Sequence, residues 1–192
     1  MIAFVLLALV ASASAGVFVN DVCPDVKPVE NFDFKAFGSG KWYELAKYPN
    51  KVETGGVCGW AEYVLNGDVF SITNYDVSKN KLRLITGSGK LRDDAGTSGR
   101  MIFSYPYGAG GSISEHKVYA LYSDDKTTVL YYCQENADKK TREDYSWIFS
   151  RSKTFEGNSK ASVEKYINDN TFLDYGKFAW TDFSDDACKY EA

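Results

Sequence analysis

The sequence is poor in the side chains from which metal and hydrolytic centres are built. Its 192 residues include a single histidine, His116, and four cysteines that lie far apart with no Cys-x-x-Cys pair. A zinc site needs a cluster of such ligands, so we expect no metal and place His116 on the outer face or the rim of the fold. There is no Gly-x-Ser-x-Gly elbow, phosphate loop or paired-acid signature. The sequence therefore predicts no catalytic residues and no enzyme activity.

Long apolar runs and an excess of positive charge are also missing. No segment after the N-terminal region is long and apolar enough to span a bilayer. The chain has 22 Lys and Arg against 26 Asp and Glu, a formal net charge of -4, and the basic residues are scattered. Binding to a phosphate backbone needs a basic stripe or patch. Neither nucleic acid nor a membrane is an expected partner.

The N-terminus has the pattern of a secretory signal peptide. An apolar run over 2–10 is too short to span a membrane, and Ala13 and Ala15 supply the small residues that signal peptidase requires. The alternative is a buried N-terminal helix. We expect residues 1–15 to be removed and 16–192 to form one secreted, extracellular domain. An even number of cysteines in a secreted chain indicates two disulfides, with three possible connectivities.

Strand-length segments with alternating aromatic residues fill the middle of the chain, which has 14 Tyr and 12 Phe. Asn66-Gly67 between two of them is a strong hairpin signal, because both residues tolerate a positive φ. No helical pattern interrupts the segments, which argues against a parallel α/β sheet. Counting one strand that opens within 38–50, the predicted strands continue over 58–65, 68–75, 82–90, 99–105, 117–123, 127–134 and 143–150.

A single helix is predicted near the C-terminus. Asn158 is a suitable N-cap, Val163, Tyr166 and Ile167 form an apolar stripe, and 168–170 ends the helix. Eight antiparallel strands in succession followed by one amphipathic helix favour an all-β fold. We expect an eight-stranded up-and-down β-barrel with the C-terminal α-helix packed outside. A barrel of this size has room for one small ligand.

The late strands are apolar on both faces, unlike an ordinary half-exposed strand. Within 143–150, Tyr145, Trp147 and Phe149 alternate with Ser146 and Ile148. One face would line a cavity, and the other would pack under the helix.

The start of the first strand resembles the lipocalins. Gly40 and Trp42 match the Gly-x-Trp motif of that family, and Arg151 matches the arginine that follows the last barrel strand. The resemblance implies that Arg151 packs over Trp42 at the closed end of the barrel. Trp42 would then be a core plug, stabilised by burial and by a cation–π contact.

Longer segments resemble a narrower group, the insect bilin-binding lipocalins, from about residue 22 to residue 190. They include CPDVKPVENFD, KWYELAKYPN and WIFSRSK. The resemblance implies disulfides Cys23–Cys133 and Cys58–Cys188, which leave no free thiol. It also implies that biliverdin, a non-covalent chromophore, binds in the open end of the barrel and makes the chain a blue pigment protein.

The resemblance further assigns a set of ligand-contacting wall positions. A tetrapyrrole needs flat aromatic surfaces and a few placed polar groups. Lys117 would meet a propionate and is expected on the inner face together with Tyr119. Asn74 and Asp76 would accept from pyrrole N–H groups, and a buried Asp76 needs a partner or solvent. Residues 50–53 would form part of the rim. The full set is Asn74, Asp76, Ile85, Tyr105, Tyr107, Lys117, Tyr119, Tyr132, Gln134, Glu143 and Tyr145.

Other functions stay open at this point. The tyrosines would serve equally as ordinary core, and Lys117 and Glu143 as strand-edge charges. The same fold serves carriers of other small lipophiles, such as carotenoids, retinoids, fatty acids or odorants. Some lipocalins are isomerases that use a pocket thiol, and a purely structural or adhesive role predicts a collapsed barrel. Assembly into a homo-oligomer is also left open.

Overall fold

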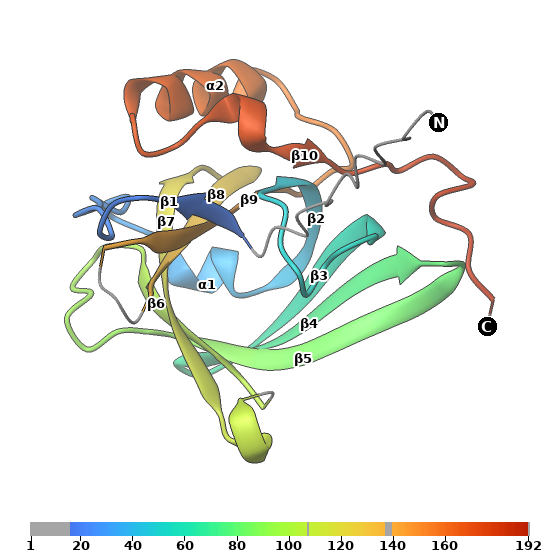
Figure 1. Ribbon diagram of the computed structural model, residues 1–192, viewed down its shortest axis with the longest axis horizontal. Helices are drawn as coiled ribbons and strands as arrows, with labels where there is room; N and C mark the ends of the chain where they lie inside the picture. Colours follow the sequence, from blue (N-terminus) through green and yellow to red (C-terminus); the bar gives the residue numbers. More distant parts are fainter. Residues whose placement is uncertain (1–15, 107, 137–139, 192) are drawn as a thin grey trace, which may run out of the picture.

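The computed structural model describes residues 16–106, 108–136 and 140–191. Its strands are β1 (Val17–Val19), β2 (Gly40–Lys47), β3 (Val57–Asn66), β4 (Val69–Ser78), β5 (Lys81–Leu91), β6 (Arg100–Tyr105), β7 (Ser114–Ser123), β8 (Thr127–Glu135), β9 (Arg142–Ser150) and β10 (Ala179–Trp180). Neighbours in sequence pair antiparallel from β2 to β9, and β9 also pairs with β2. This last pairing closes the predicted eight-stranded barrel (Figure 1).

The helical segments go beyond the one that the sequence predicts. They are α1 (Phe34–Phe37), η1 (Ala109–Gly111), α2 (Ser159–Asp169) and η2 (Tyr175–Lys177). The predicted late helix is α2, and it lies outside the barrel (Figure 1). Asn158 occupies its N-cap position, although its side chain makes no capping hydrogen bond. None of the described helices is long and apolar enough to cross a membrane.

Strand boundaries agree with the sequence to within a few residues, with two instructive differences. The β3–β4 hairpin pairs Asn66 with Val69, so its turn residues are Gly67 and Asp68 and not Asn66 and Gly67. Gly67 has φ 66°, the positive value that the first central residue of a type II′ turn requires. Strand β7 begins at Ser114 and not at residue 117, so it extends further toward the turn that joins it to β6.

Two apolar clusters lie on the two faces of the barrel wall. The outer cluster joins Val163 and Ile167 of α2 to Tyr131 and Ile148 of the wall, together with other buried residues. The inner cluster fills the barrel near Trp42 and draws on every barrel strand except β5, from which only a partly buried leucine packs against it. The apolar side chains on both faces of the late strands therefore belong to a core within the barrel and to a core beneath the helix, of which the packing under the helix was expected.

Both terminal segments are fixed to the barrel. Strand β1 pairs with β9, and β10 pairs with β2. The C-terminal segment then runs to the tip of the β4–β5 hairpin (Figure 1), where the Glu191 amide donates to the Asn80 oxygen at 2.9 Å.

Candidate ligand-binding site

The closed end of the barrel is sealed by a tryptophan beneath an arginine. Trp42 is 2% exposed, and its indole N–H donates to the Phe37 oxygen at 2.9 Å. The Arg151 guanidinium lies 3.6 Å from the centre of the Trp42 ring, and Nη1 donates to the Ser39 oxygen at 2.8 Å. Gly40 provides the positive φ, 81°, with which the chain enters β2. Trp42 is a core plug, as predicted, and does not line the open end.

Most of the predicted wall residues lie on the inner face near the open end. Cross-strand partners share a face of the sheet. Thus Asn74 pairs with Ile85, and Tyr132 pairs with Tyr145 at a ring distance of 5.4 Å. The Asn74 amide donates to the Tyr105 hydroxyl at 3.3 Å. The predicted residues on this face are Asn74, Asp76, Ile85, Tyr105, Tyr132, Gln134, Glu143 and Tyr145. Tyr107 lies outside the described residues.

The prediction that Lys117 and Tyr119 face inward is wrong. Val118 between them belongs to the inner cluster, and successive strand residues point to opposite faces. Tyr119 packs against the outer cluster and accepts from Arg92 Nη1 at 3.2 Å, while Lys117 is exposed on the same outer face. His116, expected outside or at the rim, lies on the inner face instead.

The tyrosines of the inner wall remain neutral phenols at physiological pH. Burial raises the pKa of Tyr105 to about 12, although the hydrogen bond from Asn74 opposes the shift. Burial, followed by the nearby charge of Glu143, also raises the pKa of Tyr132. The Tyr145 hydroxyl donates to Glu143 Oε2 at 2.7 Å. The wall therefore combines flat rings with O–H groups that can donate or accept.

Three charged side chains meet on the inner side of the barrel, two of them buried residues of β2 and one from the loop that joins β2 to β3. The Lys47 ammonium is 2.7 Å from Glu44 Oε1 and 3.7 Å from Glu53 Oε2. Trp147 donates its indole N–H to Glu53 Oε2 at 3.2 Å. Glu44 and Lys47 are only 6% and 9% exposed. We call Glu44, Lys47 and Glu53 the charged cluster.

A β-bulge creates the charged cluster. The register of β2 against β9 shifts between Glu44 and Ala46, so that Leu45 and Ala46 both pack in the outer cluster. One extra residue on the outer face returns Lys47 to the inner face beside Glu44. Gly59 makes room for this carboxyl group, because a Cβ there would lie 3.0 Å from Glu44 Oε1.

Glu44 holds a proton at neutral pH. Burial is the main cause and the charge of Glu53 adds to it; together they raise the pKa of Glu44 from 4.5 to about 8 against the opposing attraction of Lys47. Two carboxyl groups share one ammonium here, and desolvation of a fully buried carboxylate outweighs one favourable neighbour. Lys47 stays charged, with Glu53 as its anionic partner. The cluster thus presents both a donor and acceptors on the inner side of the barrel.

Asp76 has the partner that its burial was expected to require. Arg83 Nε donates to Asp76 Oδ1 at 2.6 Å, and the two residues face each other across the β4–β5 pair. The ion pair adds another polar group to the inner wall.

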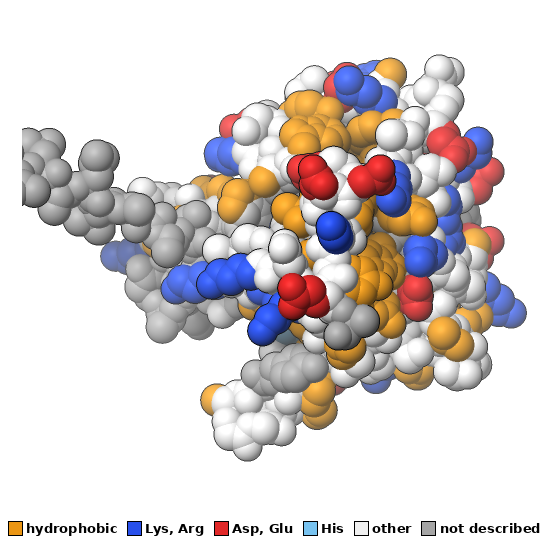
Figure 2. Space-filling model, turned by 90° about the vertical axis from the view of Figure 1, so that its right-hand side faces the viewer, with side chains coloured by type: hydrophobic (Ala, Val, Ile, Leu, Met, Phe, Trp, Pro, Cys, Tyr) orange, Lys and Arg blue, Asp and Glu red, His pale blue; other side chains and the backbone are white. Residues whose placement is uncertain are grey.

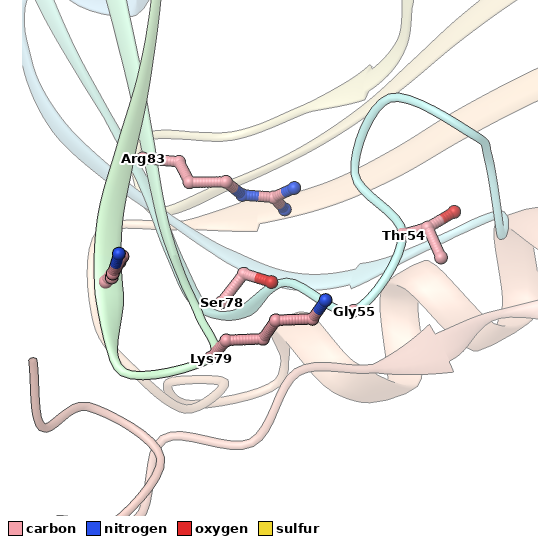
Figure 3. A pocket seen from close by; sticks show the side chains of 6 residues that line it. Thr54, Gly55, Ser78, Lys79 and Arg83 are labelled. Carbon is pink, nitrogen blue, oxygen red and sulfur yellow. The ribbon is translucent and has the colours of Figure 1, made fainter.

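A basic hollow lies at the open end, beside the rim loop that joins β2 to β3. Its volume is about 550 Å³, and Figure 3 shows it between this loop and the β4–β5 hairpin, with Arg83 and Lys79 directed toward the loop. Lys79 and Lys81 form no ion pair with a described residue. Charges of both signs are interspersed on the side of the molecule that carries the C-terminal segment (Figure 2). The lining residues are Thr54, Gly55, Ser78, Lys79, Lys81 and Arg83.

Comparison with known proteins assigns the family. Residues 39–176 match the model of the lipocalin / cytosolic fatty-acid binding protein family. This chain is a lipocalin. It is 41% identical to the bilin-binding protein of Pieris brassicae over 96% of both chains. It is 34% identical to insecticyanin-B of Manduca sexta over 97% of this chain and 91% of the relative. The solved structure of insecticyanin from the tobacco hornworm, Manduca sexta, superimposes with a TM-score of 0.83 at 33% identity, covering 92% and 94% of the two chains.

All four cysteines of the lipocalin are paired. Cys23 is bonded to Cys133, and Cys58 is bonded to Cys188, which confirms the pairing implied by the resemblance. Since the sequence contains four cysteines, this lipocalin has no thiol with which to act as a thiol-dependent isomerase.

Sequence reasoning missed several side chains of the lipocalin's inner face. Trp147 was visible from its alternation with Tyr145 but was not assigned to the ligand site. Arg83 could have been predicted from the sequence, because a short turn between β4 and β5 makes it the cross-strand neighbour of Asp76. If residues alternate strictly along β2 and Glu44 faces inward, Lys47 faces outward. Its position on the inner face therefore follows only from the bulge, which the sequence does not show.

Proposed function

We propose that this lipocalin is a secreted carrier that binds a bilin, biliverdin in particular, in the open end of its barrel. Support comes from its likeness over nearly the full chain to the bilin-binding protein of Pieris brassicae. Residues 1–15 would be removed as a signal peptide, and the two disulfides suit an extracellular protein.

The observation that carries the proposal is the mixed chemistry of the inner wall. Stacked rings of Tyr132 and Tyr145 provide a flat apolar surface. Buried polar groups, Glu44 and Lys47 above all, lie on the same inner face. Burying charged groups costs several kcal/mol unless they are paired. A hydrocarbon-like ligand would gain nothing from them, whereas a bilin presents N–H donors and carbonyl acceptors along a flat conjugated chain.

Under this proposal the protein acts by binding and not by catalysis. The aromatic faces would bury the conjugated system, and the placed polar groups would select one conformer, which fixes the colour. Asn74, Asp76 and the charged cluster would accept from pyrrole N–H groups. The ring faces of Tyr105, Tyr132 and Tyr145 would hold the chromophore against the wall.

A visible absorption titration of residues 16–192 with biliverdin tests the proposal. We expect a saturable narrowing of the red band that is complete at one equivalent. The double variant Tyr105→Ala/Tyr132→Ala should lose this change, because it removes two rings of the inner wall. The matched control Lys117→Ser/Tyr119→Phe alters the outer face of β7 and should bind as the parent does.

The proposal fails if the parent protein, shown to be folded by circular dichroism, leaves the spectrum of biliverdin unchanged. Displacement of a fluorescent fatty acid or of retinol in the same preparation would then support the alternative carrier of a colourless lipophile.

A further inference from the structure

The single histidine of the chain lies among the aromatic side chains of the inner wall. His116 of β7 pairs across the sheet with Phe103, a member of the inner cluster. Its ring centre is 4.8 Å from that of Tyr132 in an edge-on arrangement, and 6.0 Å from that of Tyr105. These two tyrosines belong to the wall that the proposed ligand would contact. His116 therefore faces the same space.

One nitrogen of His116 is satisfied and the other is not. Nε2 lies 2.8 Å from the Ser114 hydroxyl oxygen. Nδ1 is buried and has no hydrogen-bond partner among the described residues. Leaving a buried polar atom without a partner costs about 1 to 3 kcal/mol, so such atoms are rare in folded proteins. Nδ1 thus lacks a partner among the described residues, and a bound ligand would supply one.

The imidazole is neutral at neutral pH, and its tautomer depends on the direction of its hydrogen bond with Ser114. Burial lowers the pKa of His116. A neutral imidazole has one N–H donor and one acceptor nitrogen, and a serine hydroxyl can donate or accept. If Ser114 donates to Nε2, the proton resides on Nδ1, which then becomes a donor directed away from Ser114.

A bilin has both hydrogen-bond donors and hydrogen-bond acceptors, and different side chains of the inner wall suit each. Pyrrole N–H groups are donors and match the carboxyl groups of Glu44, Glu53 and Asp76. The carbonyl oxygens of the two terminal lactam rings are acceptors and need a donor elsewhere. His116 Nδ1 meets that need without adding a charge to the cavity.

We propose that His116 binds the bilin directly, donating from Nδ1 to a terminal lactam carbonyl while Ser114 donates to Nε2. This inference rests on the proposed function and names the residue that orients the chromophore. His116 contacts the ligand, and Ser114 is a positioning residue that acts through the imidazole.

A chain with one histidine allows a direct test by nuclear magnetic resonance. In protein labelled with ¹⁵N-histidine, the imidazole gives one pair of nitrogen signals, both from His116. We expect the pair of a neutral ring with its proton on Nδ1 in the complex, and a clear change in the Nδ1 signal when one equivalent of biliverdin is added. This measurement needs no substitution and so does not depend on how a variant folds.

Two variants separate hydrogen bonding from ring packing. His116→Phe keeps a ring against Tyr132 but removes both nitrogens, and it should weaken biliverdin binding by roughly 3- to 30-fold and shift the red band. His116→Asn places an amide near the position of Nδ1 and should recover most of the affinity. Ser114→Ala should have a smaller effect, and it should leave the mixture of imidazole tautomers less biased toward Nδ1–H.

The possible results distinguish the inference from the function beneath it. If biliverdin sharpens its red band on the parent protein while the His116 signals and the affinity of His116→Phe stay unchanged, the inference is wrong and the carrier function stands. If biliverdin does not bind the folded parent at all, both fail.

Discussion

At the scale of single residues, Trp42 and Arg151 hold each other in place at the closed end. The guanidinium covers the indole ring and donates to three backbone oxygens, those of Ala36, Ser39 and Lys41. These oxygens belong to the segment that enters β2, so one side chain from the end of β9 fixes the start of the barrel. Arginine suits this role because its planar group stacks and donates at the same time.

Replacing this arginine should destabilise the fold more than an ordinary surface change. Arg151→Ala removes the cation–π contact and leaves three carbonyl oxygens without their donor, so we expect a loss of about 2 to 4 kcal/mol in the free energy of unfolding. Arg151→Lys keeps the positive charge but loses the planar guanidinium group. Its free energy of unfolding should therefore lie between those of the parent protein and Arg151→Ala. Urea denaturation measures the difference, and a loss below about 0.5 kcal/mol for the alanine variant would contradict the role given to Arg151.

Glu44 should make the stability of the ligand-free protein fall as the pH rises. Its pKa is about 8 in the folded protein against 4.5 without burial. Between these pH values the folded state binds more protons than the unfolded chain, so the free energy of unfolding decreases with increasing pH. Glu44→Gln removes this titration. Between pH 5 and pH 8, the free energy of unfolding of this variant should therefore decrease by roughly 1 to 3 kcal/mol less than that of the parent protein.

Urea denaturation at several pH values tests this expectation. Glu62→Gln is a matched control, because Glu62 is a half-exposed carboxyl group on the outer face of β3, paired with Lys41. Identical pH slopes for the parent protein and Glu44→Gln would show that Glu44 titrates normally.

At the scale of elements, β-bulges adjust which side chains the strands turn inward. In β2 the bulge places Leu45 and Ala46 in the outer cluster with α2 and returns Lys47 to the inner face. A second register shift between Ala120 and Tyr122 lets Leu121 and Tyr122 both face the helix. Bulges of this kind re-aim side chains without breaking the sheet.

The β4–β5 hairpin should interact with the acidic arms of a bilin. Lys79 and Lys81 border the basic hollow with Arg83. Exposed charges of this kind are worth at most about 1 kcal/mol each, so Lys79→Ser/Lys81→Ser should weaken biliverdin binding by roughly two- to fivefold at low salt. The dimethyl ester of biliverdin, which lacks the negative charges, should bind the parent and the variant equally. Lys117→Ser, on the outer face of β7, is the control. If Lys79→Ser/Lys81→Ser lost equal affinity for biliverdin and for its dimethyl ester, an electrostatic role would be contradicted.

At the scale of the whole molecule, two disulfides fix long terminal segments to a barrel that is already closed by the β2–β9 pairing. They join residues 110 and 130 positions apart in the sequence. Cys188 lies in the C-terminal segment that continues to the β4–β5 hairpin. Besides this covalent bond, the segment is held by backbone hydrogen bonds at Asp182 and Glu191 and by the contact of Phe183 with Tyr43.

Removing the second disulfide should destabilise the protein and release the C-terminal segment. We expect Cys58→Ser/Cys188→Ser to lose about 2 to 5 kcal/mol in the free energy of unfolding. Hydrogen exchange should rise in residues 181–191 and stay low in β8 and β9, where the barrel is unaltered. Uniform loss of protection across the barrel would contradict the view that this bond anchors only the tail.

Local sequence patterns were sufficient for the strands and the late helix. Alternation of apolar residues has the period of a strand, and a glycine near residue 67 permits a tight turn, so neither depends on distant parts of the chain. The motif residues Gly40, Trp42 and Arg151 and the cysteine pairing came from family resemblance, and the structure agrees with them. The short segments α1, β1 and β10 were missed, because they are held by contacts with the barrel and have little pattern of their own.

The sequence by itself determined that the late strands have two apolar faces, but only the tertiary structure decided which face is the inside. The alternation in β7 is equally compatible with Lys117 and Tyr119 inside or with His116 and Val118 inside. The choice depends on where α2 packs and how the barrel closes, and both involve residues far away in the chain. The charged cluster is likewise invisible to alternation, because a single bulge inverts the faces beyond it.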